Sequence, residues 1–180
     1  MSAAENKIIL LLGGARSGKS AYAQELAGLA GGSVLFCATA EALDVEMQSR
    51  IQKHRMSRPP GWQTLEASKG IGRLLGRQAS KYDAIIIDCI TILVANAMGD
   101  GSEAEKAESA VNAEILSLSE LLKRRQSTYI LVSNEAGSGL VPDNKLGRIY
   151  RDELGKANQK LAAVSDEVYL LTAGIPLKLK

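Results

Sequence analysis

The stretch that most restricts the fold is "GGARSGKS" at residues 13–20, which matches the phosphate-loop pattern G-x-x-x-x-G-K-[ST]. A continuous apolar run, "KIILLL" at 7–12, precedes it, and a helical pattern over 21–30 follows it. This loop requires a strand before it and a helix after it, because the N–H groups of the turn and the positive end of the helix together hold phosphate oxygens. The sequence therefore predicts binding of a nucleoside triphosphate. A glycine-rich turn without a ligand is the alternative.

Each residue of the loop is a candidate nucleotide contact, and two of them have distinct expected roles. Lys19 reaches the β- and γ-phosphates, and the Ser20 hydroxyl ligates Mg²⁺. The candidate contacts are Gly13, Gly14, Ala15, Arg16, Ser17, Gly18, Lys19 and Ser20. Asp88 closes the apolar run "IIID", where its carboxylate could hold the hydration shell of the same Mg²⁺. An acidic residue at a strand end is common, so this second pattern is less specific.

Apolar runs of the strand type alternate with helical patterns along the chain. Further strands are predicted at 33–40, 82–90 and 128–134, and further helices after the N-cap candidate Asp44, at 104–122 and at 146–161. Such alternation predicts an α/β fold with a mainly parallel sheet flanked by helices. The last segment, 166–180, holds two strand-like runs separated by Ala173 and Gly174, which predicts an antiparallel edge hairpin. The stretch 98–109 is predicted to be a surface loop.

Composition limits the classes of partner. With 180 residues and 46% hydrophobic content the chain can bury one core, so a single domain over 1–180 is expected. A net charge of +2 gives no reason to expect nucleic acid or an anionic membrane as partner, and an aromatic content of 4% disfavours a motor that stacks bases. No apolar run approaches the roughly 20 residues of a membrane span, and Cys37 and Cys89 follow apolar runs as small buried residues do. A cytoplasmic protein without stable membrane insertion is expected.

The only histidine, His54, lies in the basic stretch "RIQKHRMSRP" at 50–59. Neighbouring cations disfavour a second positive charge, so they would keep the imidazole neutral for attack on phosphorus and would stabilise charge on the phosphates. The alternative is a histidine that packs on an amphipathic helix whose arginines face water. From the residues alone that alternative is the commoner one, and both interpretations stay open.

Other polar residues follow the predicted strands. Trp62 packs into the core or over a base, with the core favoured, and Glu66 accepts hydrogen bonds from a ligand or starts the next helix. The segment 133–144 comes directly after a strand and is expected to face a ligand at the carboxyl edge of the sheet. For Arg148 and Arg151, solvated ion pairs and ligand contacts are equally good interpretations.

Several motifs in order resemble one family: "GGARSGKS", "RIQKHRMSRPPGWQTLEA", "DCITILVAN", "SNEAGSGLVPDN" and the stretch from Arg151 to Lys180. They are similar to the bifunctional adenosylcobinamide kinase/adenosylcobinamide-phosphate guanylyltransferases of cobalamin biosynthesis. The phosphate loop is shared with many families, whereas the histidine segment and the last stretch are specific to this one. The resemblance covers nearly the whole chain after the first six residues.

The resemblance implies two reactions on a corrinoid substrate: phosphorylation of adenosylcobinamide by a nucleoside triphosphate, ATP or GTP, then transfer of GMP from GTP through a guanylylated histidine. By motif position that histidine is His54, and Lys19 is the second catalytic residue. Besides the phosphate loop, the implied nucleotide contacts are Ala38, Thr39, Ala40, Arg55, Met56, Ser57, Arg58, Glu66 and Asp88. The resemblance also implies a RecA-like P-loop fold and a homotrimer. A small-molecule P-loop kinase without nucleotidyl transfer is the alternative function.

Overall fold

The central element is a seven-stranded sheet with the strand order β3-β2-β4-β5-β1-β6-β7. The computed structural model describes residues 6–41, 45–56, 58–99 and 103–180, and for residues 45–47, 50, 53 and 54 it describes the backbone alone. Neighbouring strands are parallel except for β6 and β7, which pair antiparallel. The strands are β1 (Ile8–Gly13), β2 (Val34–Ala38), β3 (Gln63–Glu66), β4 (Ala84–Asp88), β5 (Thr128–Val132), β6 (Glu167–Thr172) and β7 (Ile175–Lys178).

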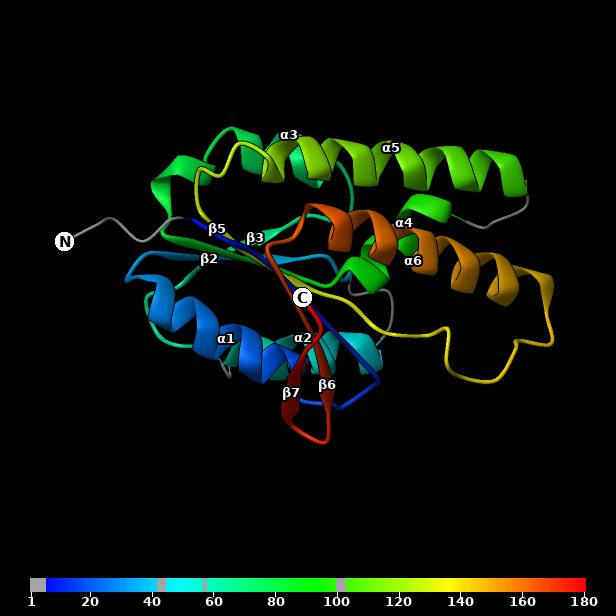
Figure 1. Cartoon of the computed structure of the whole chain (residues 1–180), viewed down its shortest axis with the longest axis horizontal. Coiled ribbons are helices and arrows are strands. Elements are labelled where there is room, and N and C mark those ends of the chain that lie inside the picture. Colours follow the sequence, from blue (N-terminus) through cyan, green and yellow to red (C-terminus); the bar gives the residue numbers. More distant parts are fainter. Residues whose placement is uncertain (1–5, 42–44, 57, 100–102) are drawn as a thin grey trace.

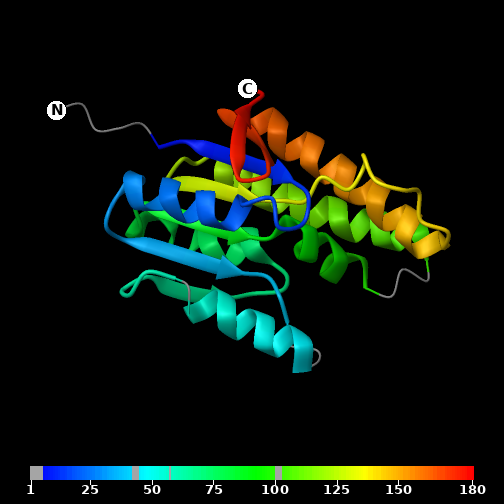
Figure 2. The ribbon, with the colours of Figure 1, turned by 90° about the horizontal axis from the view of Figure 1, so that it is seen from below.

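Helices cover both faces of this sheet. In Figure 1, α1 and α2 lie below the sheet, and α3, α4, α5 and α6 lie above it. Figure 2 gives the view from below, in which α1 runs across the sheet and α2 lies beside its β3 edge. The helices are α1 (Lys19–Ala30), α2 (Val45–Met56), α3 (Ile71–Gly76), α4 (Ile90–Met98), α5 (Ala104–Leu122) and α6 (Lys145–Val164), with a short 3-10 helix at Ala79–Lys81.

The strands alternate their side chains between two hydrophobic cores. In β1, Ile8 and Leu10 belong to the larger core, under α3 to α6, whereas Ile9 and Leu11 belong to the smaller core with α1. Leu10 and Leu11 are both fully buried. A strand buried on both faces reads as a continuous apolar run, because no position on it faces water. This explains why the run at 7–12 is so regular in sequence.

The predicted α/β fold with a mainly parallel sheet is confirmed, and so is the antiparallel hairpin at its end. Two predictions were wrong in extent. The apolar run 82–90 does not form one strand, because β4 ends at Asp88 and Ile90 begins α4. The stretch 98–109 is not a loop throughout, because α5 begins at Ala104. The sequence did not predict β3, α3 or α4. The proposed N-cap Asp44 lies outside the described residues.

Trp62 and the two cysteines can be compared with the expectations from the sequence. Trp62 is half-buried and packs against the smaller core, as favoured from the sequence. Both cysteines are free, and burial raises the pKa of the Cys37 thiol to about 12. Within the described part of the chain, no helix has the length and apolar character of a membrane span.

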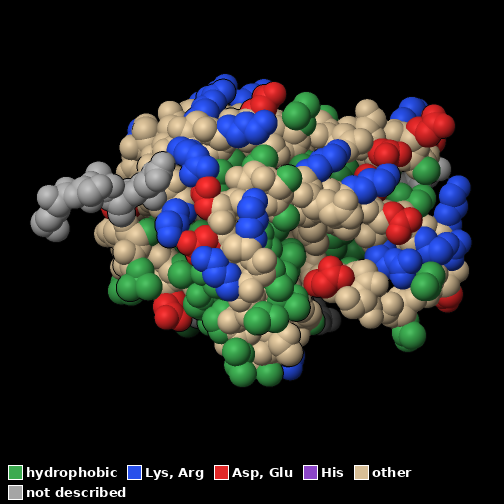
Figure 3. Space-filling view, viewed as in Figure 1, with side chains coloured by type: hydrophobic (Ala, Val, Ile, Leu, Met, Phe, Trp, Pro, Cys, Tyr) green, Lys and Arg blue, Asp and Glu red, His purple; other side chains and the backbone are tan. Residues whose placement is uncertain are grey.

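The β6–β7 hairpin carries a hydrophobic surface. Figure 3 shows hydrophobic side chains gathered over the lower part of the molecule, where this hairpin projects. Ile175 is 70% exposed, and Leu177 and Leu179 are more than half exposed. β7 forms the free edge of the sheet on this side.

Asp166 connects three separate parts of the chain at the amino end of the sheet. Its carboxylate accepts a hydrogen bond from the backbone N–H of Ile8 at 2.8 Å and two from the Arg125 guanidinium at 2.9 and 2.7 Å. Hydrogen bonding to Arg125 lowers the pKa of Asp166 from its ordinary value. The charged carboxylate therefore stabilises the folded chain.

We expect Asp166→Asn to lower the free energy of unfolding by about 1.5–3 kcal/mol at pH 7, the usual range for hydrogen bonds to a charged group. Because the pKa of Asp166 is lower in the folded state, its contribution is complete above the unfolded pKa of about 3.9 and is lost as the pH falls through the folded value. Urea unfolding at a series of pH values should thus show the two proteins converging in acid. Asp152→Asn is the matched control, since that side chain is 66% exposed and lies 3.9 Å from Arg151. An equal loss in the control would contradict the assignment.

Candidate active site

The phosphate loop runs from the end of β1 to the start of α1 and is held by the β6–β7 hairpin. Gly13 has φ +148, and a Cβ there would lie 2.5 Å from the Leu171 carbonyl oxygen of β6. Gly18 has φ +97, and a Cβ there would lie 3.1 Å from Gly174 Cα. The Gly174 N–H donates to the Ser17 carbonyl at 3.0 Å. Glycine is therefore required at 13 and 18 both by backbone conformation and by close contact.

The Lys19 side chain lies against the backbone of this loop. Its ammonium donates to the carbonyls of Gly13 and Gly14 at 2.9 and 2.6 Å, and the side chain is buried. Burial lowers the pKa of Lys19, while the nearby Asp88 carboxylate opposes that shift. The cation predicted to meet the β- and γ-phosphates is thus placed within the curve of the loop.

Ser20 at the start of α1 and Asp88 at the end of β4 meet, although β1, the strand that leads into α1, is not a neighbour of β4. The Ser20 hydroxyl donates to Asp88 Oδ2 at 2.8 Å, and β5 separates β1 from β4 in the sheet. A hydroxyl beside a carboxylate supplies the hard oxygen ligands that Mg²⁺ prefers. No group of three or more His, Cys, Asp or Glu side chains gathers among the described residues. This donor set fits Mg²⁺, which is usually held by one or two protein oxygens together with substrate phosphates and water.

The basic segment at the end of α2 reaches the same edge of the sheet. Arg55 Nη1 lies 3.6 Å from Glu66 Oε1, and both side chains are more than half exposed. Glu66 ends β3 in register with Ala38 of β2, which is in register with Asp88 of β4. The contact therefore brings Arg55 to the carboxyl edge that also carries the Ser20–Asp88 pair.

Arg58 lies closer to the sheet than Arg55. Its guanidinium stacks on the Phe36 ring at 3.7 Å from the centroid and donates to Thr64 Oγ1 at 2.9 Å. Burial lowers the pKa of Arg58, whereas the Asp88 carboxylate raises it. The buried Nε has no hydrogen-bond partner in the described part of the chain. This donor of the Arg58 guanidinium is therefore unsatisfied among the described residues.

Other candidates in this segment are less fully described. His54 lies in the last turn of α2, directly before Arg55, and its side chain is outside the described set. Ser57 lies outside the described residues altogether. Met56 is 80% exposed. The structure therefore brings Arg55, Arg58, Glu66 and Asp88 together and leaves the orientation of the histidine open.

The side chain of Thr39, another predicted nucleotide contact, forms hydrogen bonds within the fold. It is fully buried, and its hydroxyl accepts from the Cys89 N–H at 2.8 Å and donates to the Cys89 carbonyl at 2.9 Å. These bonds join the end of β2 to the end of β4. The neighbouring Ala38 and Ala40 lie at the same edge, Ala40 half-buried. Any contact of this segment with nucleotide would come from its backbone or its alanines.

Two positioning residues were missed from the sequence. The Asn96 amide donates to the carbonyls of Thr39 and Ser68 at 2.9 and 3.3 Å, which holds the segment after β2 in place. Thr91 Oγ1 accepts from the Asn134 N–H at 2.8 Å. Asn96 and Thr91 are polar residues in the otherwise apolar helix α4. That contrast was the only sign in the sequence that they have a positioning role.

The segment 133–144, expected to face a ligand, joins the phosphate loop through its backbone. The Glu135 N–H donates to the Gly13 carbonyl at 3.1 Å. The Glu135 carboxylate accepts from the N–H groups of Gly137 and Ser138. Arg148 donates to the carbonyls of Pro142 and Asp143 at 3.0 and 2.7 Å. Among the described residues Arg148 thus forms no ion pair, and its hydrogen bonds to backbone carbonyls fix the end of this segment.

Comparison with known proteins agrees with this geometry. Residues 9–179 match the CobU family, described as cobinamide kinase / cobinamide phosphate guanyltransferase. The chain belongs to this family. It is 42% identical to the bifunctional adenosylcobalamin biosynthesis protein CobU of Salmonella typhimurium and 39% identical to CobU of Escherichia coli, with 96% of this chain and 99% of each relative covered. It is 39% identical to the bifunctional protein CobP of Pseudomonas aeruginosa, with 95% and 96% covered.

Membership of the CobU family confirms the resemblance drawn from the motifs. It covers the phosphate loop, the basic segment and the β6–β7 hairpin in one match. The three regions that meet at the carboxyl edge therefore belong to one family pattern, although they are far apart in the sequence.

Thr39→Val tests whether the Thr39 hydroxyl stabilises the fold of this CobU family member or contacts the nucleotide. The isosteric change leaves the buried Cys89 N–H without an acceptor, so we expect the free energy of unfolding to fall by about 1–3 kcal/mol. Thr39→Ser, which keeps the hydroxyl, should restore most of that loss in urea unfolding. A stable Thr39→Val protein with weakened nucleotide affinity would instead show that the hydroxyl contacts the nucleotide.

Proposed function

We propose that this protein phosphorylates adenosylcobinamide with a nucleoside triphosphate and then transfers GMP from GTP to adenosylcobinamide phosphate. The products of the second step are adenosylcobinamide-GDP and pyrophosphate. The observation that carries the proposal is the convergence of the Ser20–Asp88 pair and the Arg55–Glu66 pair on one edge of the sheet. Family membership supports both reactions, because the CobU family is described by both.

In the kinase step, the phosphate loop would hold the triphosphate and Lys19 would neutralise the charge that develops as the γ-phosphoryl group moves. Ser20 and Asp88 would hold Mg²⁺ through their oxygens. When bound, that ion supplies charge neutralisation to the phosphates. The chain's own contribution is to orient the triphosphate through Gly13–Ser20 and to keep its γ-phosphoryl group beside Lys19.

In the transfer step, His54 would act as the nucleophile. Its imidazole nitrogen attacks the α-phosphorus of GTP, a nitrogen–phosphorus bond forms, and pyrophosphate leaves with the electrons of the broken phosphorus–oxygen bond. A phosphate oxygen of adenosylcobinamide phosphate then attacks the same phosphorus and releases the imidazole. Arg55 and Arg58 are positioned at the edge where they could stabilise the phosphate charge in both steps.

Further parts of the proposal follow from the family and from the site. The nucleotide contacts would be residues 13–20, 38–40 and 55–58 together with Glu66 and Asp88. The chain would act as a single nucleotide-binding domain over 1–180. We also propose a homotrimer located in the cytoplasm.

His54→Ala should abolish acid-labile labelling of the protein by α-labelled GTP and abolish GMP transfer, while phosphorylation of adenosylcobinamide keeps its rate. The reason is that His54 is the only histidine of the chain, so no second imidazole can form the intermediate. Mass analysis after incubation with GTP and Mg²⁺ locates the adduct. Labelling that survives the substitution would rule out His54, and a native protein that releases no pyrophosphate from GTP would indicate a kinase without nucleotidyl transfer.

Lys19→Met should impair both reactions, because one phosphate loop serves both nucleotides in this proposal. Methionine keeps the length of the buried side chain and removes its charge. We expect kcat/KM to fall by roughly 10²- to 10³-fold in each assay, the usual cost of losing one electrostatic contact to a transition state. Thermal unfolding of the same variant controls for damage to the loop, since Lys19 also bonds Gly13 and Gly14. Loss of one activity alone would mean that the two reactions use separate sites.

A further inference from the structure

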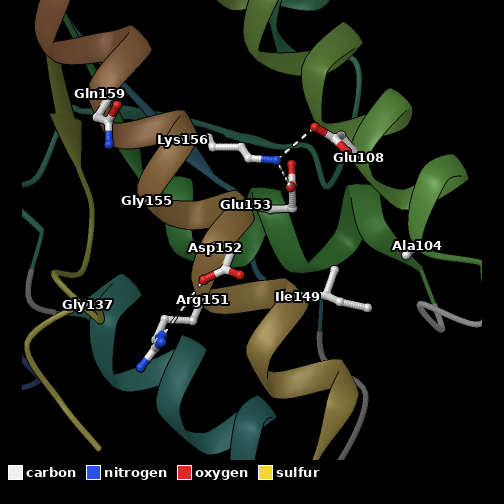
Figure 4. A pocket seen from close by; sticks show the side chains of 10 residues that line it. All are labelled: Ala104, Glu108, Gly137, Ile149, Arg151, Asp152, Glu153, Gly155, Lys156 and Gln159. Atoms are coloured by element: carbon white, nitrogen blue, oxygen red, sulfur yellow. Dashed lines mark hydrogen bonds and ion pairs between the residues drawn. The ribbon is translucent and has the colours of Figure 1, made fainter. Parts of the chain in front are cut away.

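A groove crosses α6 on the opposite face of the sheet from α1. It has a volume of about 540 Å³ and is bounded by α5 on one side and by the segment after β5 on the other (Figure 4). It continues into a second hollow of about 350 Å³ that shares Gly137, Arg151, Gly155 and Gln159 with it. The groove therefore forms one continuous concave surface along α6.

The second hollow brings this surface to the phosphate loop. Its lining includes Leu12, which directly precedes Gly13, and Glu135, whose N–H donates to the Gly13 carbonyl at 3.1 Å. A ligand seated in the groove would therefore have one end next to the strand terminus from which the phosphate loop begins. That is the place from which an acceptor group could approach a phosphate held by Lys19.

The charges of the groove indicate what kind of ligand it suits. Its two cations, Arg151 and Lys156, are accompanied by three carboxylates, Glu108, Asp152 and Glu153. Figure 3 shows the same mixture of acidic and basic side chains at the end of the molecule where α6 begins. A lining with a slight excess of negative charge disfavours a second nucleotide or another phosphate. It suits a part of a ligand that carries no phosphate and offers both hydrogen-bond donors and acceptors.

Glu153 adds a specific acceptor. The residue is 3% exposed, and Oε1 accepts from the Lys156 ammonium at 2.9 Å, while Lys156 also donates to Glu108 at 2.7 Å. Figure 4 shows Glu153, Lys156 and Glu108 converging between α6 and α5. Oε2 of Glu153 has no hydrogen-bond partner among the described residues. A buried carboxylate oxygen without a donor is costly, and Glu153 lines the groove, so an N–H group of a ligand would satisfy Oε2 once the side chains that cover it shift aside.

We propose that this groove binds the amide-bearing edge of the cobinamide substrate and directs its reacting group toward the phosphate loop. Primary amides supply N–H donors for Glu153 and Glu108 and carbonyl acceptors for Arg151 and Gln159, which is the combination that the lining requires. This inference rests on the proposed function for the identity of the acceptor. It assigns the acceptor to the α6 face of the sheet and the nucleotide to the α1 face.

Gly155→Phe fills the groove and tests the proposal. A Cβ at Gly155 meets no atom within 4 Å, so the ring can enter the groove without displacing its neighbours. Gly28→Phe is the matched control, because Gly28 also lies in a helix, α1, and its Cβ would likewise meet nothing within 4 Å. We expect Gly155→Phe to raise the KM for adenosylcobinamide and its Kd in equilibrium dialysis by at least about tenfold. The KM for ATP and the formation of guanylylated protein from GTP alone should stay unchanged, as should all values for Gly28→Phe.

Glu153→Gln is a second variant that keeps the shape of the groove and removes one carboxylate. It should also raise the Kd for adenosylcobinamide while leaving guanylylation from GTP intact. An unchanged Kd in Gly155→Phe overturns the proposal, and so does an equal rise in the KM for ATP, since the groove would then belong to the nucleotide. Dialysis needs no turnover, so native protein that binds adenosylcobinamide in this groove without phosphorylating it would refute the proposed function and leave the groove assignment standing.

Discussion

The backbone of Gly13 is the point on which the candidate site depends. Its carbonyl oxygen accepts from the Lys19 ammonium at 2.9 Å and from the Glu135 N–H at 3.1 Å. Its α-carbon leaves no room for a side chain beside the Leu171 carbonyl. One peptide unit therefore joins β1, the start of α1, the segment after β5 and β6. Any change that moves it moves the phosphate loop and the entrance of the α6 groove together.

Charge is distributed unequally between the two faces of the sheet near this point. On the α1 face, Lys19 and Arg58 both lie within the electrostatic reach of Asp88, and Arg58 stacks on Phe36 of the smaller core. On the α6 face, the cations Arg151 and Lys156 are offset by carboxylates. A site that handles polyphosphate needs an excess of positive charge near a hard-oxygen metal site, whereas a groove that holds the phosphate-free part of an acceptor does not. The structure separates these two environments by the thickness of one sheet.

The sequence predicted those features that are encoded locally. The phosphate loop, the doubly buried strands and the hairpin at 166–180 each depend on residues that are neighbours in the chain, so their patterns can be read directly. β3 was missed because "QTLE" is a four-residue edge strand with no buried position. α4 was missed because only Asp88 and Cys89 separate the apolar run of β4 from "ITILVANAM", so 82–90 resembles a single strand. The stacking of Arg58 on Phe36 and the bonds from Asn96 to Thr39 are long-range contacts, and no spacing in the sequence predicts them.

The place of β6 beside β1 also has a consequence for the order in which the protein can assemble. The Ile8 N–H and the Asp166 carboxylate that receives it are 158 residues apart in the chain. β1 thus emerges early from the ribosome but lacks one of its two neighbours until almost the whole sequence has been synthesised, and such non-local pairing slows folding. Until Gly174 reaches Ser17, the phosphate loop has no support on that side. Nucleotide-binding competence should therefore be one of the last properties that the nascent chain acquires.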